Sequence, residues 1–180
     1  MQYPHEDVPM KTVITLILAL VLAGCASYSG YGLKPGVSTG ADVMQTMGEP
    51  AMRWKEPDGS ELLAYPRGPA GFDTFMVRID SKGTLASIEG VLNVPHFALI
   101  QEGMSQDDVL RTLGPSVGMW TVYFPRRDEL VWEWRFCDAW NEAARFNVLF
   151  DNTTGKVRTT QSYTEGQMRR FPVRCSHAFR

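Results

Sequence analysis

One helix pattern occurs twice in this sequence, and the second copy lies 66 residues after the first. Each copy begins with a hydroxyl side chain, Thr39 or Ser105, followed three residues later by an aspartate, Asp42 or Asp108. This is the spacing of a capping box at a helix start, and a glycine with a proline just beyond it marks each helix end. The same offset aligns Leu33 with Leu99, Val43 with Val109, Met47 with Leu113 and Trp54 with Trp120. The repetition predicts two related units, each of which begins with a short helix.

Strand patterns follow each helix in the same order. Residues 75–85 and 146–157 alternate apolar and polar side chains before a turn that contains aspartate and glycine, which predicts one β-hairpin per unit. Residues 61–65 and 129–136 predict a further strand between each helix and its hairpin. We therefore expect an α+β protein of two tandem units. In each, a short helix or pair of helices packs on a three- to four-stranded antiparallel sheet.

The repeat also sets the expected domain organisation. The first unit is expected over residues 33–92 and the second over 97–165, with a C-terminal tail over 166–180. Residues 91–100 connect the units, and Pro95 is expected to interrupt that connection. A single unit of this length has only a marginal hydrophobic core. Two units whose sheets join or stack bury more apolar surface, so we expect the units to pack together.

The N-terminal region predicts export. Residues 1–24 are typical of a signal peptide, and we place the true start at Met10 because acidic residues precede it where a positive charge is usual. The apolar run over residues 13–23 is too short for a membrane-spanning helix, which needs about 20 residues. Residues 22–25, Leu-Ala-Gly-Cys, are similar to a bacterial lipobox and predict lipidation of Cys25. A plain signal peptide, or a buried helix that ends in cysteine, is the alternative.

Residues 25–32 are expected to form a flexible tether that joins the lipid on Cys25, and hence the membrane, to the folded units. Ala26 stands where an aspartate is typical of inner-membrane lipoproteins, so we expect an outer-membrane lipoprotein that faces the periplasm. Removal of residues 1–24 leaves 156 of the 180 residues with a net charge of −1. This near-neutral balance argues against a nucleic-acid partner.

Two cysteines remain besides Cys25. Because the periplasm is oxidising, Cys137 and Cys175 are predicted to form a disulfide. Two free or buried thiols are one alternative, and a metal site that joins these cysteines to His177 is another.

Sequence patterns typical of catalysis are missing. The chain has no H-x-x-x-H or C-x-x-C spacing, no G-x-S-x-G and no phosphate-binding glycine loop. Asp107 and Asp108 fit a helix cap better than a pair of catalytic carboxylates. The sequence therefore predicts no enzyme activity, no cofactor and no small-molecule substrate.

The candidate partner-binding residues are aromatic. Trp132 and Trp134 alternate on one face of a predicted strand, and the simpler interpretation places both in the core under the helix. The alternative exposes them, with Tyr123 and Trp140, as a surface for a protein partner in the envelope. The tail is either solvated or contacts anionic lipid headgroups through Arg169, Arg170, Arg174 and Arg180.

The motif G-x-S-x-x-x-V-x-x-x-L-G-x-P, preceded by leucine and followed by an aromatic strand and a hairpin, resembles the SmpA/OmlA/BamE-like lipoprotein domain. The match covers residues 33–88 and again 99–163. Two such domains in tandem resemble the arrangement of β-lactamase inhibitory proteins. The resemblance implies helices on one face of an antiparallel sheet and an open face that can hold a protein partner.

The resemblance also implies a function. The best-known member of the lipoprotein family is a non-enzymatic accessory subunit of the outer-membrane β-barrel assembly machine. We therefore expect a binding or scaffold role in cell-envelope maintenance, with outer-membrane protein assembly as the candidate process. The tandem arrangement implies an alternative, a periplasmic inhibitor of a hydrolase.

Overall fold

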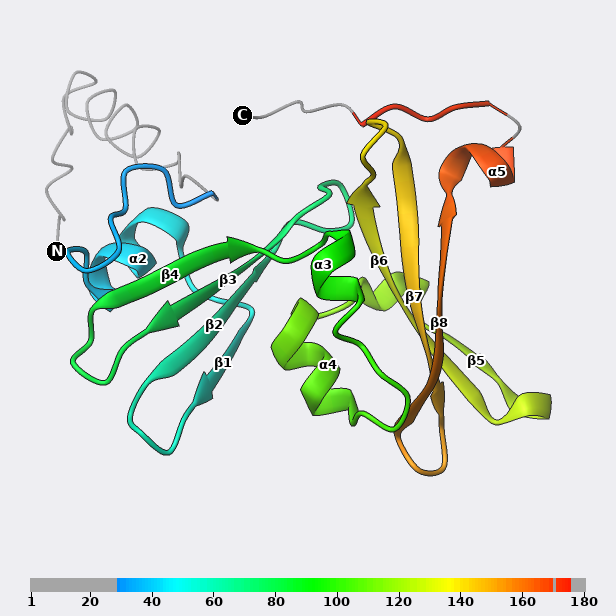
Figure 1. Ribbon diagram of the computed structural model, residues 1–180, viewed down its shortest axis with the longest axis horizontal. Coiled ribbons are helices and arrows are strands. Elements are labelled where there is room, and N and C mark those ends of the chain that lie inside the picture. Colours follow the sequence, from blue (N-terminus) through cyan, green and yellow to red (C-terminus); the bar gives the residue numbers. More distant parts are fainter. Residues whose placement is uncertain (1–28, 170, 176–180) are drawn as a thin grey trace, which may run out of the picture.

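The computed structural model describes residues 29–169 and 171–175. Over these residues the strands form two separate four-stranded antiparallel sheets, one in the order β1-β2-β3-β4 and the other in the order β5-β6-β7-β8 (Figure 1). Each sheet is a meander in which consecutive strands pair. The expected α+β class is confirmed. The predicted signal peptide over residues 1–24 and the lipidation site Cys25 lie outside the described residues.

The elements follow the predicted order in both units. The first unit contains α2 (Gly40–Met47), β1 (Met52–Lys55), β2 (Glu61–Pro66), β3 (Thr74–Ile79) and β4 (Leu85–Gly90). The second unit contains α3 (Val94–Phe97), α4 (Gln106–Leu113), η1 (Gly118–Trp120), β5 (Val122–Phe124), η2 (Pro125–Arg127), β6 (Glu129–Cys137), β7 (Ala143–Asp151), β8 (Lys156–Thr164) and α5 (Glu165–Arg169). No helix in these ranges is long and apolar enough to cross a membrane.

The predicted capping boxes form at the start of both helices. The backbone N–H of Asp42 donates to the Thr39 hydroxyl, and the backbone N–H of Asp108 donates to the Ser105 hydroxyl, each at 3.2 Å. The carboxylates of Asp42 and Asp108 accept in return from the N–H groups of Thr39 (2.7 Å) and Ser105 (2.8 Å). Each box satisfies two backbone donors that a helix start otherwise leaves unpaired.

Loss of one capping hydroxyl has a moderate expected cost. Ser105→Ala is expected to lower the free energy of unfolding by about 1 kcal/mol, because the Asp108 N–H loses its acceptor. In a domain of this size the melting temperature falls by about 2–4 °C, measured by circular dichroism. Thr39→Ala is the matched change in the first unit and is expected to have the same effect. Unchanged melting of both variants would mean that these caps do not contribute to stability.

The repeat extends to side-chain hydrogen bonds at the helix ends. Gly48 and Gly114 end the two helices with φ angles of 83° and 69°, a conformation that glycine adopts without strain. The carbonyl of Gly48 accepts from the Tyr65 hydroxyl, and that of Gly114 accepts from Trp134 Nε1, both at 3.2 Å. Tyr65 and Trp134 therefore occupy equivalent positions in β2 and β6.

The expected alignment of Trp54 with Trp120 is wrong. Trp54 lies in β1 opposite Leu62, whereas the equivalent pair in the second sheet joins Val122 to Val131. Trp120 lies in η1, before the first strand of its sheet begins. The offset changes because the connection from helix to first strand is longer in the second unit, over residues 114–121 instead of 48–51.

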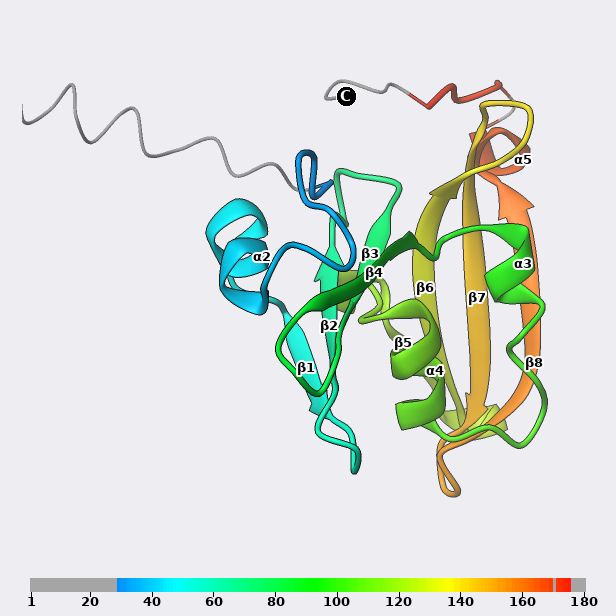
Figure 2. The same ribbon diagram turned by 60° about the vertical axis from the view of Figure 1, so that its left-hand side comes forward.

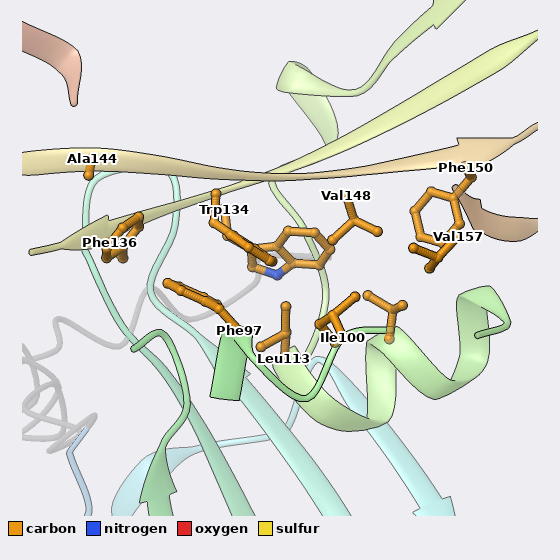
Figure 3. Close-up of a cluster of buried hydrophobic side chains, with 11 residues drawn as sticks. Phe97, Ile100, Leu113, Trp134, Phe136, Ala144, Val148, Phe150 and Val157 are labelled. Atoms are coloured by element: carbon orange, nitrogen blue, oxygen red, sulfur yellow. The ribbon is translucent and has the colours of Figure 1, made fainter. Parts of the chain in front are cut away.

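The helix α4 lies between the two sheets (Figure 2). Its Val109 and Leu113 pack on the second sheet, where Leu113 lies with Phe97 opposite Trp134 (Figure 3). Its Leu110 packs on the first sheet. The opposite face of the first sheet is covered by α2 through a second cluster, made of Val43, Met47, Leu63, Tyr65, Val77, Ile79 and Leu85. The layers are thus α2, first sheet, α4, second sheet. On the outer face of the second sheet, Glu165 of α5 contacts Arg135 and Arg145, and the ring of Trp120 in η1 lies over Arg145.

The two ends of the first unit differ from expectation. Pro95 does not interrupt the connection between the units; it lies in the first turn of α3, which Asn93 caps. Phe97 of this helix stacks on Phe146 with ring centroids 4.1 Å apart, so the connection forms part of the second core. At the other end Gly30 is buried, and its carbonyl accepts from the Leu33 N–H at 3.0 Å. The packed region therefore begins within the predicted tether.

Candidate functional site

Of the four predicted partner-binding aromatics, Trp132 and Trp134 are neighbours, with ring centroids 6.3 Å apart, whereas Tyr123 and Trp140 lie away from them. Trp134 is only 1% exposed, and Trp132 packs against the same core, which agrees with the simpler interpretation of both residues. Tyr123 is 46% exposed in β5, opposite Leu130 at the start of β6. Trp140 is 80% exposed in the turn that follows β6, at the opposite end of that strand. Trp134 is therefore a core residue, and Tyr123 and Trp140 belong to different surfaces.

Removal of the Trp140 side chain is expected to leave stability unchanged. Its backbone N–H donates to Asp138, and its carbonyl accepts from Arg174, so both hydrogen bonds survive Trp140→Ala. An exposed side chain without packing contributes less than about 0.5 kcal/mol. The melting temperature is expected to stay within about 2 °C of the wild type. Trp132→Ala is the matched control and is expected to melt clearly lower; equal melting of both variants would contradict these assignments.

The most apolar exposed segment runs from η1 through β5. Met119 is 76% exposed, and the three residues of β5, Val122, Tyr123 and Phe124, are 44%, 46% and 40% exposed. We call residues 119–124 the edge segment, because β5 is an edge strand of the second sheet. Proteins usually cover or charge an apolar edge strand, since it offers both backbone groups and apolar surface to another chain.

Backbone geometry identifies the free groups of this edge. The carbonyl of Glu133 in β6 accepts from the Val117 N–H at 3.1 Å, so it points to the β5 side. Backbone groups of successive strand residues point to alternate sides. The β6 residues that pair with Val122 and Phe124 therefore also face β5. Tyr123 lies between these pairs, and its N–H and C=O point away from β6, towards the open edge.

A largely apolar cavity of about 390 Å³ lies beside the edge segment, between the two units. Residues 115–119, which lead into β5, form one wall, and Trp134 and Arg135 of β6 contribute to it. The first unit contributes Ala51, Pro66, Gly68, Pro69 and Thr74. Because Met119 belongs to both features, the cavity is continuous with the edge segment.

The outer face of the second sheet carries a charged cluster. Glu165 is 1% exposed, and its carboxylate accepts from Arg135 Nε and Arg145 Nε, each at 2.7 Å. Arg145 also pairs with Glu133, which accepts from the Tyr163 hydroxyl at 2.7 Å. Burial opposes ionisation of Glu165, but the two arginines outweigh it and hold the pKa of this carboxyl below its usual value. The cluster ties β6, β7 and β8 together.

The equivalent face of the first sheet is apolar. Ala64 and Met76 occupy the equivalent face of the first sheet and are covered by α4 and its neighbours. In the second sheet Glu133 and Asn147 stand opposite each other at those positions. The second sheet thus carries polar side chains where the first sheet has apolar ones, and Asn147 among them is only 5% exposed.

The remaining candidate residues have structural roles. Asp108 caps α4, and Asp107 accepts from Trp54 Nε1 (3.0 Å) and Arg111 Nε (2.6 Å), which joins the units. Within the described part of the chain, no three His, Cys, Asp or Glu side chains are placed to hold a metal ion. His177 lies outside that part. The predicted disulfide between Cys137 and Cys175 is present.

Comparisons with known proteins give little further information. No model of a protein family matches the sequence, and a search of curated proteins finds no match. Among solved structures, an extracellular protein containing a SCP domain from Bacillus anthracis str. Ames shows a weak similarity, with a TM-score of 0.25 and 12% sequence identity. The match covers 77% of this chain and 48% of that protein, so this chain spans about half its length. A similarity at this level supports no inference about fold or function.

Proposed function

We propose that this chain is a lipid-anchored envelope protein of the outer membrane, which faces the periplasm and binds a protein partner without catalysing a reaction. The proposal includes two BamE-like units and a scaffold role in envelope maintenance, with outer-membrane β-barrel assembly as the leading process. The lipobox at Cys25 and the repeated motif support the location and the family. The exposed edge segment supports the binding role.

The edge segment is the observation on which the binding role rests. Four large apolar side chains within residues 119–124 are 40% exposed or more, and they lie on an edge strand beside an apolar cavity. Isolated apolar residues on a surface are ordinary, whereas a contiguous group of them is typical of an interaction site. Buried charged side chains elsewhere, such as Glu165 and Arg145, pair with each other and so serve the fold.

The test is a mild-detergent purification of the full-length protein from its own envelope, read by mass spectrometry. A matched variant, Val122→Lys, places a charge on the edge strand without a large change in buried surface. Enrichment of β-barrel assembly subunits with the wild type, and its loss with Val122→Lys, is the expected result. Enrichment of a single hydrolase would instead favour the inhibitor alternative.

Anchoring is tested separately with labelled palmitate. Labelling of the wild type and loss of label in Cys25→Ala are expected if Cys25 carries the lipid. Equal labelling of both proteins would show that the anchor is elsewhere, and no labelling of either would remove the lipoprotein proposal.

A further inference from the structure

We propose that the edge segment binds an extended segment of a partner protein, which adds to β5 as a fifth strand of the second sheet and places a large apolar side chain in the cavity between the units. The inference deepens the proposed function, since it rests on the existence of a protein partner. It names the binding mode and the chemistry of the segment that is recognised: a β-strand with apolar side chains at alternate positions.

The backbone of β5 carries the first step. Among the described residues β5 pairs only with β6, and Tyr123 directs both its N–H and its C=O to the open side. A donor and an acceptor on one residue match the paired groups of an added strand, and main-chain hydrogen bonds supply affinity in this mode of recognition. A helix presents no free backbone groups, so it does not satisfy this edge.

Side chains carry the second step. Val122 and Phe124 lie on the outer face of the sheet, the face that also holds Leu149, which is 8% exposed. An added strand has its own side chains beside Val122 and Phe124 at every second position. Apolar residues at those positions remove both exposed side chains from water.

The third part of the inference concerns the cavity, which selects partner segments that have a large apolar side chain at one end. Val117 also lies at this edge of the sheet, because its N–H bonds to β6, and its side chain lines the cavity; η1 interrupts the edge between Val117 and β5. A strand that extends along β5 and past η1 reaches the cavity at one end. Its volume of about 390 Å³ is in the range of small-ligand pockets and accommodates an aromatic side chain.

A second copy of this chain fits the edge less well. In a two-fold antiparallel pairing of β5 with itself, the segment that follows Phe124 approaches the cavity. That segment is η2, in which Arg127 pairs with Glu129, so the exposed and charged Arg126 would meet apolar walls. One end of the β5 edge meets an apolar cavity and the other end meets a charged turn. This difference favours a different protein, and not a second copy of this chain, as the partner.

The test uses photo-crosslinking of the full-length lipidated protein in its native envelope. Benzoylphenylalanine replaces Phe124, and the cross-linked partner segment is identified by mass spectrometry. Tyr123→Pro removes only an outward N–H from the backbone, because proline is tolerated on an edge strand where that group faces solvent. Tyr123→Ala is the matched control, which removes the ring and keeps the N–H. Circular dichroism verifies that each variant is folded, and Val122→Lys replaces Tyr123→Pro if the latter does not fold.

The expected adduct is one segment with alternating apolar residues, from a different protein. Its yield is expected to fall at least tenfold with Tyr123→Pro and by less than about threefold with Tyr123→Ala, since main-chain bonds dominate this mode. An equal yield with both variants, a helical segment, or an adduct with a second copy would overturn the inference. A second probe replaces Trp140 with benzoylphenylalanine. If only this second probe captures an envelope partner, the inferred binding mode is overturned and the proposed function stands. If the cross-linked segment is a β-strand of a secreted hydrolase, the inferred binding mode stands and the proposed envelope function is overturned.

Discussion

Replacement of Cys137 and Cys175 together by serine is expected to lower the free energy of unfolding by about 4 kcal/mol. The disulfide closes a loop with a sequence separation of 38 residues, and the chain-entropy model gives this value for such a loop. The bond holds the C-terminal tail where the Ala143 N–H donates to the Val173 carbonyl at 2.7 Å. The melting temperature is expected to fall by about 8–16 °C in thermal unfolding of the lipid-free protein.

The effect is expected to reach the first unit as well. Phe72, from the loop between β2 and β3, packs against Ala143 and Cys175, so the tail forms part of the junction between the units. Dithiothreitol is expected to lower the melting temperature of the wild type to that of the double serine variant and to leave that variant unchanged. A thiol count that finds both cysteines free in the denatured, unreduced protein would contradict the prediction.

Local signals made most of the secondary structure predictable. The caps at Thr39 and Ser105 depend on side chains within three residues of each other, so their geometry follows from spacing alone. An apolar run predicted β2, whose two faces both lie in cores, and alternating aromatic residues predicted β6, which has one face in a core. The first strand of each sheet was not predicted individually. All three residues of β5 are exposed, and an edge strand without a buried face has no clear alternation.

The way in which the two units pack together was harder to predict from the sequence. The sequence predicted sheets that join or stack, and the structure shows that they stack with α4 between them. Leu110 makes the contact with the first sheet, and Met44, which occupies the same position in α2, is half-buried just as Leu110 is. The two helices have the same apolar pattern, so sequence alone does not identify the one that is shared. Tertiary context decides it.

The edge segment was predicted from the sequence only in part. Tyr123 was among the predicted partner-binding residues, whereas Met119, Val122 and Phe124 were missed. Their signal is an apolar run, Gly118 to Phe124, that lacks any charge before the following Pro-Arg-Arg. The charged cluster had no such signal, because Glu165 contacts arginines that lie 20 and 30 residues away.

Glu165→Ala is expected to lower the free energy of unfolding by about 3 kcal/mol. The carboxylate is shared by Arg135 and Arg145, whose side chains are only 20% and 12% exposed. Its removal leaves two half-buried cations beside each other without a common partner, and loss of one member of a buried ion pair costs about 3–5 kcal/mol. Urea unfolding at pH 7 measures the loss, and Glu89→Gln, an exposed carboxylate, is the control with an expected loss below about 0.5 kcal/mol.

The contribution of Glu165 is expected to depend on pH with a defined sign. Its pKa is lowered in the folded state, so the stabilisation is complete above the unfolded pKa of about 4.3 and is lost as pH falls through the lower folded value. Glu165→Gln keeps the shape of the side chain and removes the charge. The difference in unfolding free energy between wild type and this variant is therefore expected to shrink between pH 7 and pH 3. A constant difference over that range would mean that packing of α5, and not the charge on Glu165, holds the outer face of the second sheet together.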